Sequence, residues 1–317
     1  MDSLSHGLIG IAVAGLSGQP FSFHDPIYLA AMLGAQAPDF DIIAQVKGNF
    51  SYLRQHRAFS HSLPGIALWS LLISLGLFIF APQANLLSLF GWAFSGSLSH
   101  IIVDYCNTHG AAILWPLCKE RKSLQLLNVF DPLLSVLLLS VYTLNLPMPM
   151  VSWISFALFI SYGVFRLLLR QKASKQLRQR FSQKAILKST VMPSLKRVLS
   201  WDFVLETETS YFVGQLGFLS PTLKIHAELA KQNYISDFAL LAKKTILGSF
   251  FTTFTPFMYV KEQKNMHYIS VAIYDLRYIL NEQFLHRATI IFDHNQIPVR
   301  SYLHSCGSTM KIPCGSS

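Results

Sequence analysis

Apolar stretches separated by short polar turns dominate the first half of the chain. Residues 4–16 and 27–37 are apolar and rich in glycine and alanine. Each is shorter than the roughly 20 residues that a helix needs to cross a bilayer. Longer apolar runs follow at 63–80, 86–103, 133–146 and 151–169. This pattern predicts two short N-terminal helices and about four membrane-spanning helices that run alternately up and down.

The pattern changes near residue 197. Two β-rich runs around a polar turn at 201–217 predict a hairpin, while 223–247 has a mainly helical pattern. Further strands are predicted at 257–260, 267–275 and 288–293. The sequence therefore predicts a multi-pass α-helical membrane bundle followed by a small α+β domain.

Composition supports this division. The chain is 51% hydrophobic and 13% charged, whereas a soluble domain carries roughly 25% charged residues. The deficit of charge lies before residue 170, which indicates a membrane-embedded region. We expect a bundle at 1–170, a basic linker at 171–197 and the α+β domain at 198–317.

The positive charges are distributed unevenly along the bundle. The formal net charge is +10, and the loops at 18–26, 81–85 and 147–150 contain no lysine or arginine. The loops at the other end of the bundle and the stretch after residue 169 carry many lysine and arginine residues. By the positive-inside rule, that end and the C-terminal domain are predicted to face the cytoplasm. The basic charge then indicates membrane lipids as partners, and nucleic acid is not expected.

Histidine and aspartate residues fall at the helix ends in an alternating order. They lie at the start of the first, third and fifth predicted helices and at the end of the second and fourth. An up-and-down bundle therefore brings them to one end. The residues are His6, Asp39, Asp41, His56, His61, His100, Asp104, His109 and Asp131.

His100 and Asp104 are the strongest pair in this set. They are four residues apart, so they share one face of a helix, and His100 interrupts an otherwise apolar run. Imidazole and carboxylate groups are ligands for zinc and other divalent ions. Because the helix ends supply more ligands than one tetrahedral ion uses, one to three ions are expected, with zinc favoured over manganese.

Each of these residues also has a structural interpretation. His6 can simply begin a helix, and Asp39 or Asp41 can terminate one. Ser60 and Ser62 are natural N-caps. Asp131 can cap the fifth predicted helix or orient a ligand, and His109 can position a loop.

Five segments together carry a family resemblance. The residues 1–7, 38–41, 56–62, 100–104 and 108–110 resemble the YdjM-like family of bacterial inner-membrane proteins. The resemblance implies the metal ligands His6, Asp39, His56, His61, His100, Asp104 and His109. One departure is Ala58, which stands where longer members of the family often carry glycine. Later segments at 201–206, 211–214 and 274–278 resemble the longer members.

The resemblance implies a membrane-bound, metal-dependent hydrolase in the bacterial inner membrane. Its ligand pattern is similar to that of helical zinc-dependent phospholipases C and single-strand nucleases, which suggests a phosphoester by analogy. In the leading hypothesis, metal-activated water attacks a phosphoester or lipid-linked substrate at the cytoplasmic face. Asp104 or Asp41 acts as general base, and Arg57 binds a phosphate oxygen.

Two other classes of protein fit parts of the sequence. Histidine and aspartate in membrane helices also mark ion paths, so a metal transporter or sensor is one alternative. The other is a membrane-anchored binding module, with the C-terminal domain as the working part. Ligands gathered at one end favour the hydrolase, because a transporter needs polar groups near mid-membrane.

Overall fold

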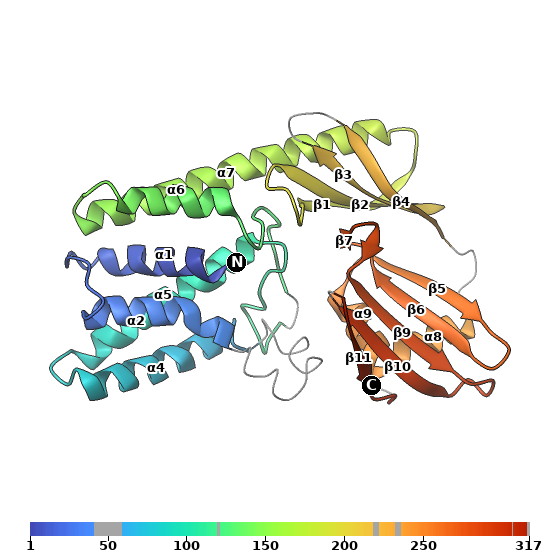
Figure 1. Cartoon of the computed structure of the whole chain (residues 1–317), viewed down its shortest axis with the longest axis horizontal. Helices are drawn as coiled ribbons and strands as arrows, with labels where there is room; N and C mark the ends of the chain where they lie inside the picture. Colours follow the sequence, from blue (N-terminus) through green and yellow to red (C-terminus); the bar gives the residue numbers. More distant parts are fainter. Residues whose placement is uncertain (41–58, 119–120, 218–221, 232–235, 306, 316–317) are drawn as a thin grey trace. The chain divides into compact units, whose positions relative to one another are not determined.

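The computed structural model of the chain describes two compact units (Figure 1). The first consists of Met1–Lys172 and Lys196–Val198, and the second of Ala173–Leu195 and Leu199–Ser317. The described residues are 1–40, 59–118, 121–217, 222–231, 236–305 and 307–315.

The first unit is helical. Its described helices are α1 (Ser3–Gly15), α2 (Pro26–Gln36), α4 (Leu63–Phe80), α5 (Leu86–Cys106), α6 (Pro132–Tyr142) and the first part of α7 (Met148–Arg180). Side-chain oxygens cap five of these helices by accepting a backbone N–H of the first turn. The capping residues are Asp2, Asp25, Ser62, Asn85 and Asp131.

Among the described residues, three helices are long and apolar enough to cross a membrane. They are α4, α5 and α7. The run 133–146, predicted as a further span, is helical only over Pro132–Tyr142, because the chain turns at Thr143 and Asn145 has a positive φ of 49°. Eleven residues rise about 16 Å, roughly half of a bilayer core.

Small residues allow α2 and α5 to approach closely. A Cβ atom added at Gly96 would lie 2.1 Å from the carbonyl oxygen of Ala31, and one at Gly34 would lie 2.2 Å from that of Ala93. Contacts of this kind bring helix backbones together inside membranes. The close approach matters for the site, because α2 leads to Asp39 and α5 carries His100 and Asp104.

Gly96→Ala is expected to destabilise the helical unit by about 1–3 kcal/mol, because the added methyl group forces α2 and α5 apart. The thermal unfolding temperature of detergent-purified protein measures the effect. Gly91→Ala on the same helix is the matched control, since nothing lies within 4 Å of its added Cβ. Equal unfolding temperatures for the two variants would contradict this account of the packing.

The second unit begins with a four-stranded antiparallel sheet in the order β1-β2-β3-β4. The strands are β1 (Ile186–Pro193), β2 (Ser200–Thr207), β3 (Ser210–Gly217) and β4 (Leu223–Ala230). The predicted hairpin at 201–217 is confirmed as β2 and β3, which pair in register from Ser200↔Gly217 to Glu206↔Tyr211.

Two stretches differ from the prediction. The stretch expected as a linker contains the end of α7 and strand β1, because Ala173, Leu177 and Phe181 recur every fourth residue and are buried. The stretch 223–247, predicted as helical, begins with β4. Its Leu-Lys-Ile-His-Ala-Glu-Leu order alternates apolar and polar residues with a period of two, which suits the edge of a sheet.

A second, five-stranded sheet completes this unit, in the order β11-β10-β9-β6-β5. The strands are β5 (Met258–Lys264), β6 (Ile269–Asp275), β9 (His286–Phe292), β10 (Pro298–Ser305) and β11 (Ser308–Ile312), with the short hairpin β7 (Ile279–Leu280) and β8 (Gln283–Phe284) between β6 and β9. Helices α8 (Asp237–Lys244) and α9 (Ile246–Phe254) pack against the buried face, where the rings of Phe238 and Phe292 meet. The strands predicted at 257–260, 267–275 and 288–293 are confirmed.

Candidate metal centre

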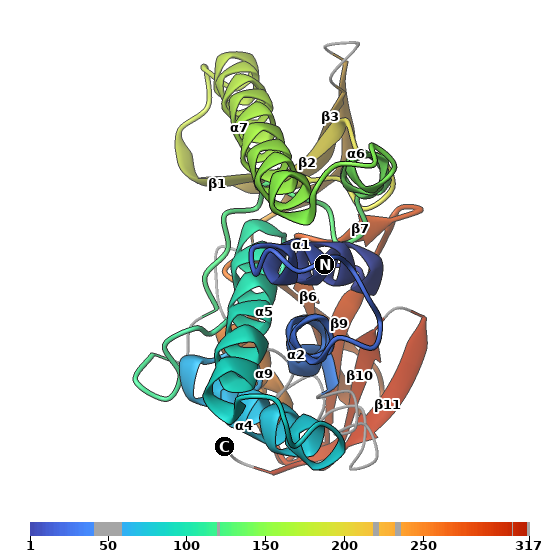
Figure 2. The same ribbon diagram turned by 90° about the vertical axis from the view of Figure 1, so that its left-hand side faces the viewer.

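Three separate parts of the helical unit bring four side chains to one point. Asp39 follows the end of α2, His61 precedes the start of α4, and His100 and Asp104 lie on the last two turns of α5. Figure 2 shows α2, α4 and α5 next to one another within the helical unit. The alternating helix directions therefore place these residues at a common end, as the sequence predicts.

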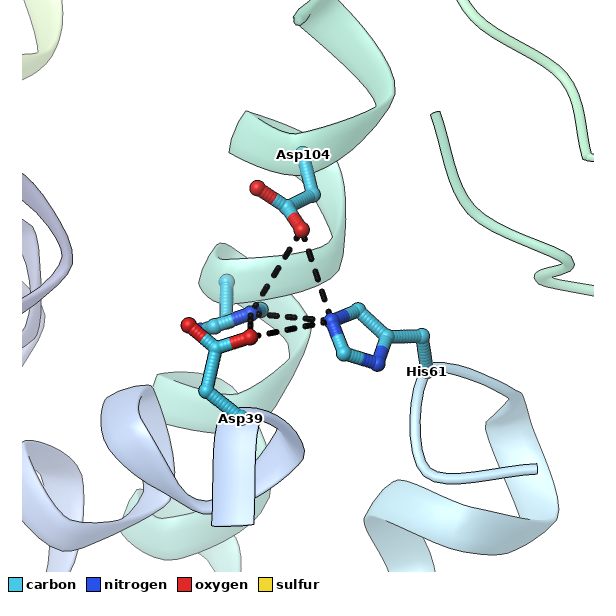
Figure 3. A group of neighbouring side chains, drawn as sticks. Asp39, His61 and Asp104 are labelled. Atoms are coloured by element: carbon cyan, nitrogen blue, oxygen red, sulfur yellow. Dashed lines mark hydrogen bonds and ion pairs between the residues drawn. The ribbon is translucent and has the colours of Figure 1, made fainter. Parts of the chain in front are cut away.

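The ligand atoms of these four residues all lie within 4.8 Å of one another. His61 Nε2 lies 3.5 Å from Asp39 Oδ1 and 3.4 Å from Asp104 Oδ2 (Figure 3). His100 Nε2 lies 3.3 Å from His61 Nε2, 3.6 Å from Asp39 Oδ1 and 3.7 Å from Asp104 Oδ2. Two imidazole nitrogens and two carboxylate oxygens thus point at one small volume.

Contacts on the far side of each ring orient the two histidines. His100 Nδ1 lies 2.7 Å from the carbonyl oxygen of Ala35, which only accepts, so this nitrogen carries the proton. In the neutral ring, Nε2 then presents its lone pair to the cluster. His61 Nδ1 lies 2.9 Å from the hydroxyl of Ser60. Such outer contacts are how proteins fix metal-binding histidines.

Burial strengthens the electrostatics of the cluster. His61, His100 and Asp104 are fully buried, while the Asp39 side chain is 28% exposed. Burial opposes ionisation of Asp39, but the adjacent rings of His100 and His61 outweigh it and hold the pKa of that carboxyl well below its usual range. An ionised carboxylate beside two imidazoles is the state that binds a cation.

His6 lies next to this group rather than within it. Its ring stacks on that of His100, with centroids 3.7 Å apart and planes 11° apart, and its Nε2 lies 3.4 Å from Asp104 Oδ1. His6 is 1% exposed, and neither ring nitrogen has a hydrogen-bond partner among the described residues. A buried polar group without a partner is unfavourable, so a cation is a fitting occupant beside it.

The two oxygens of Asp104 face different neighbours. Oδ2 faces His61 and His100, whereas Oδ1 faces His6, accepts a hydrogen bond from Asn107 Nδ2 at 2.8 Å and contacts the amino group of Met1. One carboxylate therefore has ligand groups on both sides. The donor set of imidazole and carboxylate fits divalent ions such as zinc or manganese.

The remaining predicted residues are placed differently. His109 lies in the loop after α5, where its Nδ1 is 3.3 Å from the hydroxyl of Thr108, and it does not belong to the group of four. Asp131 caps α6 and accepts hydrogen bonds from Tyr162. The predictions for Asp41, His56 and Arg57 lie outside the described residues.

Fold and site together define a helical membrane protein with a buried His/Asp cluster that can hold a metal ion. The chain belongs to the YdjM inner membrane protein family, whose family model matches residues 1–173. A second family model, the YfhP C-terminal alpha/beta plait domain, matches residues 237–312. These two matches confirm the resemblance to longer family members.

The uncharacterized protein YfhP of Bacillus subtilis (strain 168) is similar over most of the chain. The two sequences are 28% identical over 224 residues, which cover 68% of each chain. No solved structure matches this chain.

Proposed function

We propose that the protein is a membrane-bound, metal-dependent hydrolase that acts on a phosphoester or lipid-linked substrate at the cytoplasmic face of the bacterial inner membrane. The observation that supports this proposal is the convergence of Asp39, His61, His100 and Asp104 from three parts of the bundle within 4.8 Å. His6, buried and without a hydrogen-bond partner among the described residues, extends the donor set.

A divalent ion at such a site polarises water and stabilises the charge that develops on a phosphoryl group. The chain's own residues hold the donor atoms in place before any substrate binds. Ala35 and Ser60 fix the two histidine rings, and Asn107 fixes one oxygen of Asp104. Asp39 is partly exposed, so the cluster is reachable from its side.

The cluster's position favours a hydrolase over a transporter. All four ligand residues lie at or near helix ends, on one side of the unit. The charge pattern of the loops supports a cytoplasmic location for that side. A cluster at the ends of membrane helices lies near the level of the lipid headgroups, which is why we propose a phosphoester or lipid-linked substrate.

The test is metal content and hydrolysis in the same detergent-purified, full-length preparation. Elemental mass spectrometry is expected to find stoichiometric zinc or manganese, and His61→Ala to lose it. Hydrolysis of bis(p-nitrophenyl) phosphate and of a phospholipid in mixed micelles is expected to stop on chelation and to return with added metal.

Two results would contradict the proposal. One is a wild type without metal after reconstitution with Zn²⁺ or Mn²⁺. The other is a protein that binds metal and hydrolyses neither phosphoester, but carries Zn²⁺ or Mn²⁺ into proteoliposomes. That result would favour the transporter.

A further inference from the structure

A stripe of polar side chains runs along α7, inside the helical unit. Tyr162, Arg166 and Arg170 are spaced four residues apart, so they share one face of the helix. Arg166 is fully buried although α7 is a candidate membrane span. A buried arginine in such a helix is unfavourable unless its donors are all used, and it marks a functional position by default.

These side chains bind one short segment, residues 124–131. Arg166 Nε donates to the carbonyl of Leu126 at 2.9 Å, and its Nη2 donates to Asn128 Oδ1 at 2.9 Å. Arg170 Nη1 donates to the carbonyl of Leu124 at 2.9 Å. The segment is therefore held to α7 by charge-assisted hydrogen bonds, which are stronger than neutral ones.

The same segment is bound on its other side to the end of α5. Leu124 N donates to the carbonyl of Tyr105 at 2.8 Å. Leu126 N and Leu127 N both donate to the carbonyl of Cys106, at 2.9 and 3.0 Å. The segment thus lies between α7 and the residues that directly follow Asp104.

The end of α5 is where the cluster's most central carboxylate is fixed. Asn107 N donates to the carbonyl of Asp104 at 3.2 Å, and its side chain donates to Asp104 Oδ1 at 2.8 Å. Ser123, directly before the segment, donates its hydroxyl proton to the carbonyl of Asn107. A shift of the segment would therefore move Asn107 and, with it, Asp104.

A second branch leads from the stripe to α1. Tyr162 donates to the carboxylate of Asp131, with its hydroxyl 3.0 and 2.9 Å from the two oxygens. Ser135 donates to the carbonyl of Asp131 at 3.0 Å, and its hydroxyl lies 2.9 Å from that of Ser5. Ser5 precedes His6, so this branch ends beside the stacked histidine pair.

We propose that Tyr162, Arg166 and Arg170 are positioning residues of the metal centre, which fix Asp104 through residues 123–128 and His6 through Asp131 and Ser5. This inference rests on the proposed metal site. Arg166 also donates to the carbonyl of Val198. Val198 lies in the three-residue stretch Lys196–Val198, whose neighbours on both sides in the chain belong to the C-terminal unit.

The test uses Co²⁺ as a spectroscopic probe of the centre in full-length protein. Arg166→Gln and Arg170→Gln are expected to shift the visible absorption bands of bound Co²⁺. They are also expected to weaken Co²⁺ binding by up to about 10-fold, the lower end of the effect of losing a direct contact to a ligand, because neither arginine touches a ligand itself. Lys175→Gln, an exposed cation further along the same helix, is the control and should leave spectrum and affinity unchanged.

Two further variants keep the test informative if Arg166→Gln does not fold. Arg166→Lys retains the charge but cannot reach three acceptors at once, so its affinity should fall between those of wild type and Arg166→Gln. Tyr162→Phe removes only one hydroxyl and should shift the Co²⁺ bands through the α1 branch.

The outcomes separate this inference from the proposed function. A wild type that takes up no Co²⁺ overturns both. Wild-type Co²⁺ binding with unchanged spectra and affinity in Arg166→Gln, Arg170→Gln and Tyr162→Phe overturns the positioning role alone.

Discussion

Asp104→Ala is expected to abolish metal binding by the purified protein. The carboxylate of Asp104 contacts both sides of the cluster, through Oδ2 toward His61 and His100 and through Oδ1 toward His6. Losing an outer contact typically weakens metal affinity 10- to 100-fold, so we expect the loss of this central ligand to exceed about 100-fold. Elemental mass spectrometry and Zn²⁺ titration of detergent-purified protein measure the effect.

Two variants show whether the loss is specific. Asp104→Asn keeps the shape of the side chain and removes only its charge, so a matching loss of metal would assign the effect to the carboxylate. Asp25→Ala is the control, because Asp25 caps α2 at its other end and its loss costs about 1 kcal/mol of stability. Retention of full metal content by Asp104→Ala would show that the cluster serves packing instead.

Asp275→Ala is expected to destabilise the C-terminal unit by about 3–5 kcal/mol, because it leaves Arg277 without its buried partner. Asp275 is fully buried, and its Oδ2 lies 2.8 Å from Arg277 Nη2. Its other oxygen accepts a hydrogen bond from Thr255 at 2.7 Å. Hydrogen exchange of full-length protein should show protection of the β6 and β9 amides falling on the order of 100-fold or more.

The double variant Asp275→Leu with Arg277→Met should recover much of the lost protection, since removing both charges leaves no unpaired group. Glu206→Ala supplies the comparison. Its carboxylate lies 2.7 Å from Lys231 Nζ, but both side chains are about one-fifth exposed, so a smaller loss is expected. Similar losses for Asp275→Ala and Glu206→Ala would show that the buried pair has no special role.

Much of the helical unit could be predicted because its signals are local. The run Leu63–Phe80 lies between the N-cap Ser62 and a turn, and α4 has those bounds. The alternation of helix starts and ends predicted the convergence of Asp39, His61, His100 and Asp104. The end of α6 could not be predicted, because Leu144 and Leu146 continue the apolar pattern after the helix has stopped.

Other features depend on partners far away in the sequence. Arg166 interrupts the apolar run at 151–169, and this signal marks it as exceptional. However, its acceptors at Leu126, Asn128 and Val198 become known only from the fold. The stacking of His6 on His100 likewise depends on the packing of α1 against α5. Strand β4 could have been predicted, because apolar and polar residues alternate along it. The helical interpretation of 223–247 does not take this alternation into account.

The return of Lys196–Val198 to the helical unit makes both units discontinuous along the chain. The sequence crosses from one unit to the other after Lys172, Leu195 and Val198. No single peptide bond therefore separates them, and cleavage near residue 183 leaves each fragment carrying a piece of the other's unit. A shortened chain that stops at Lys172 would also lack one carbonyl that Arg166 binds. A single cut in the chain therefore cannot separate the two units into two complete modules.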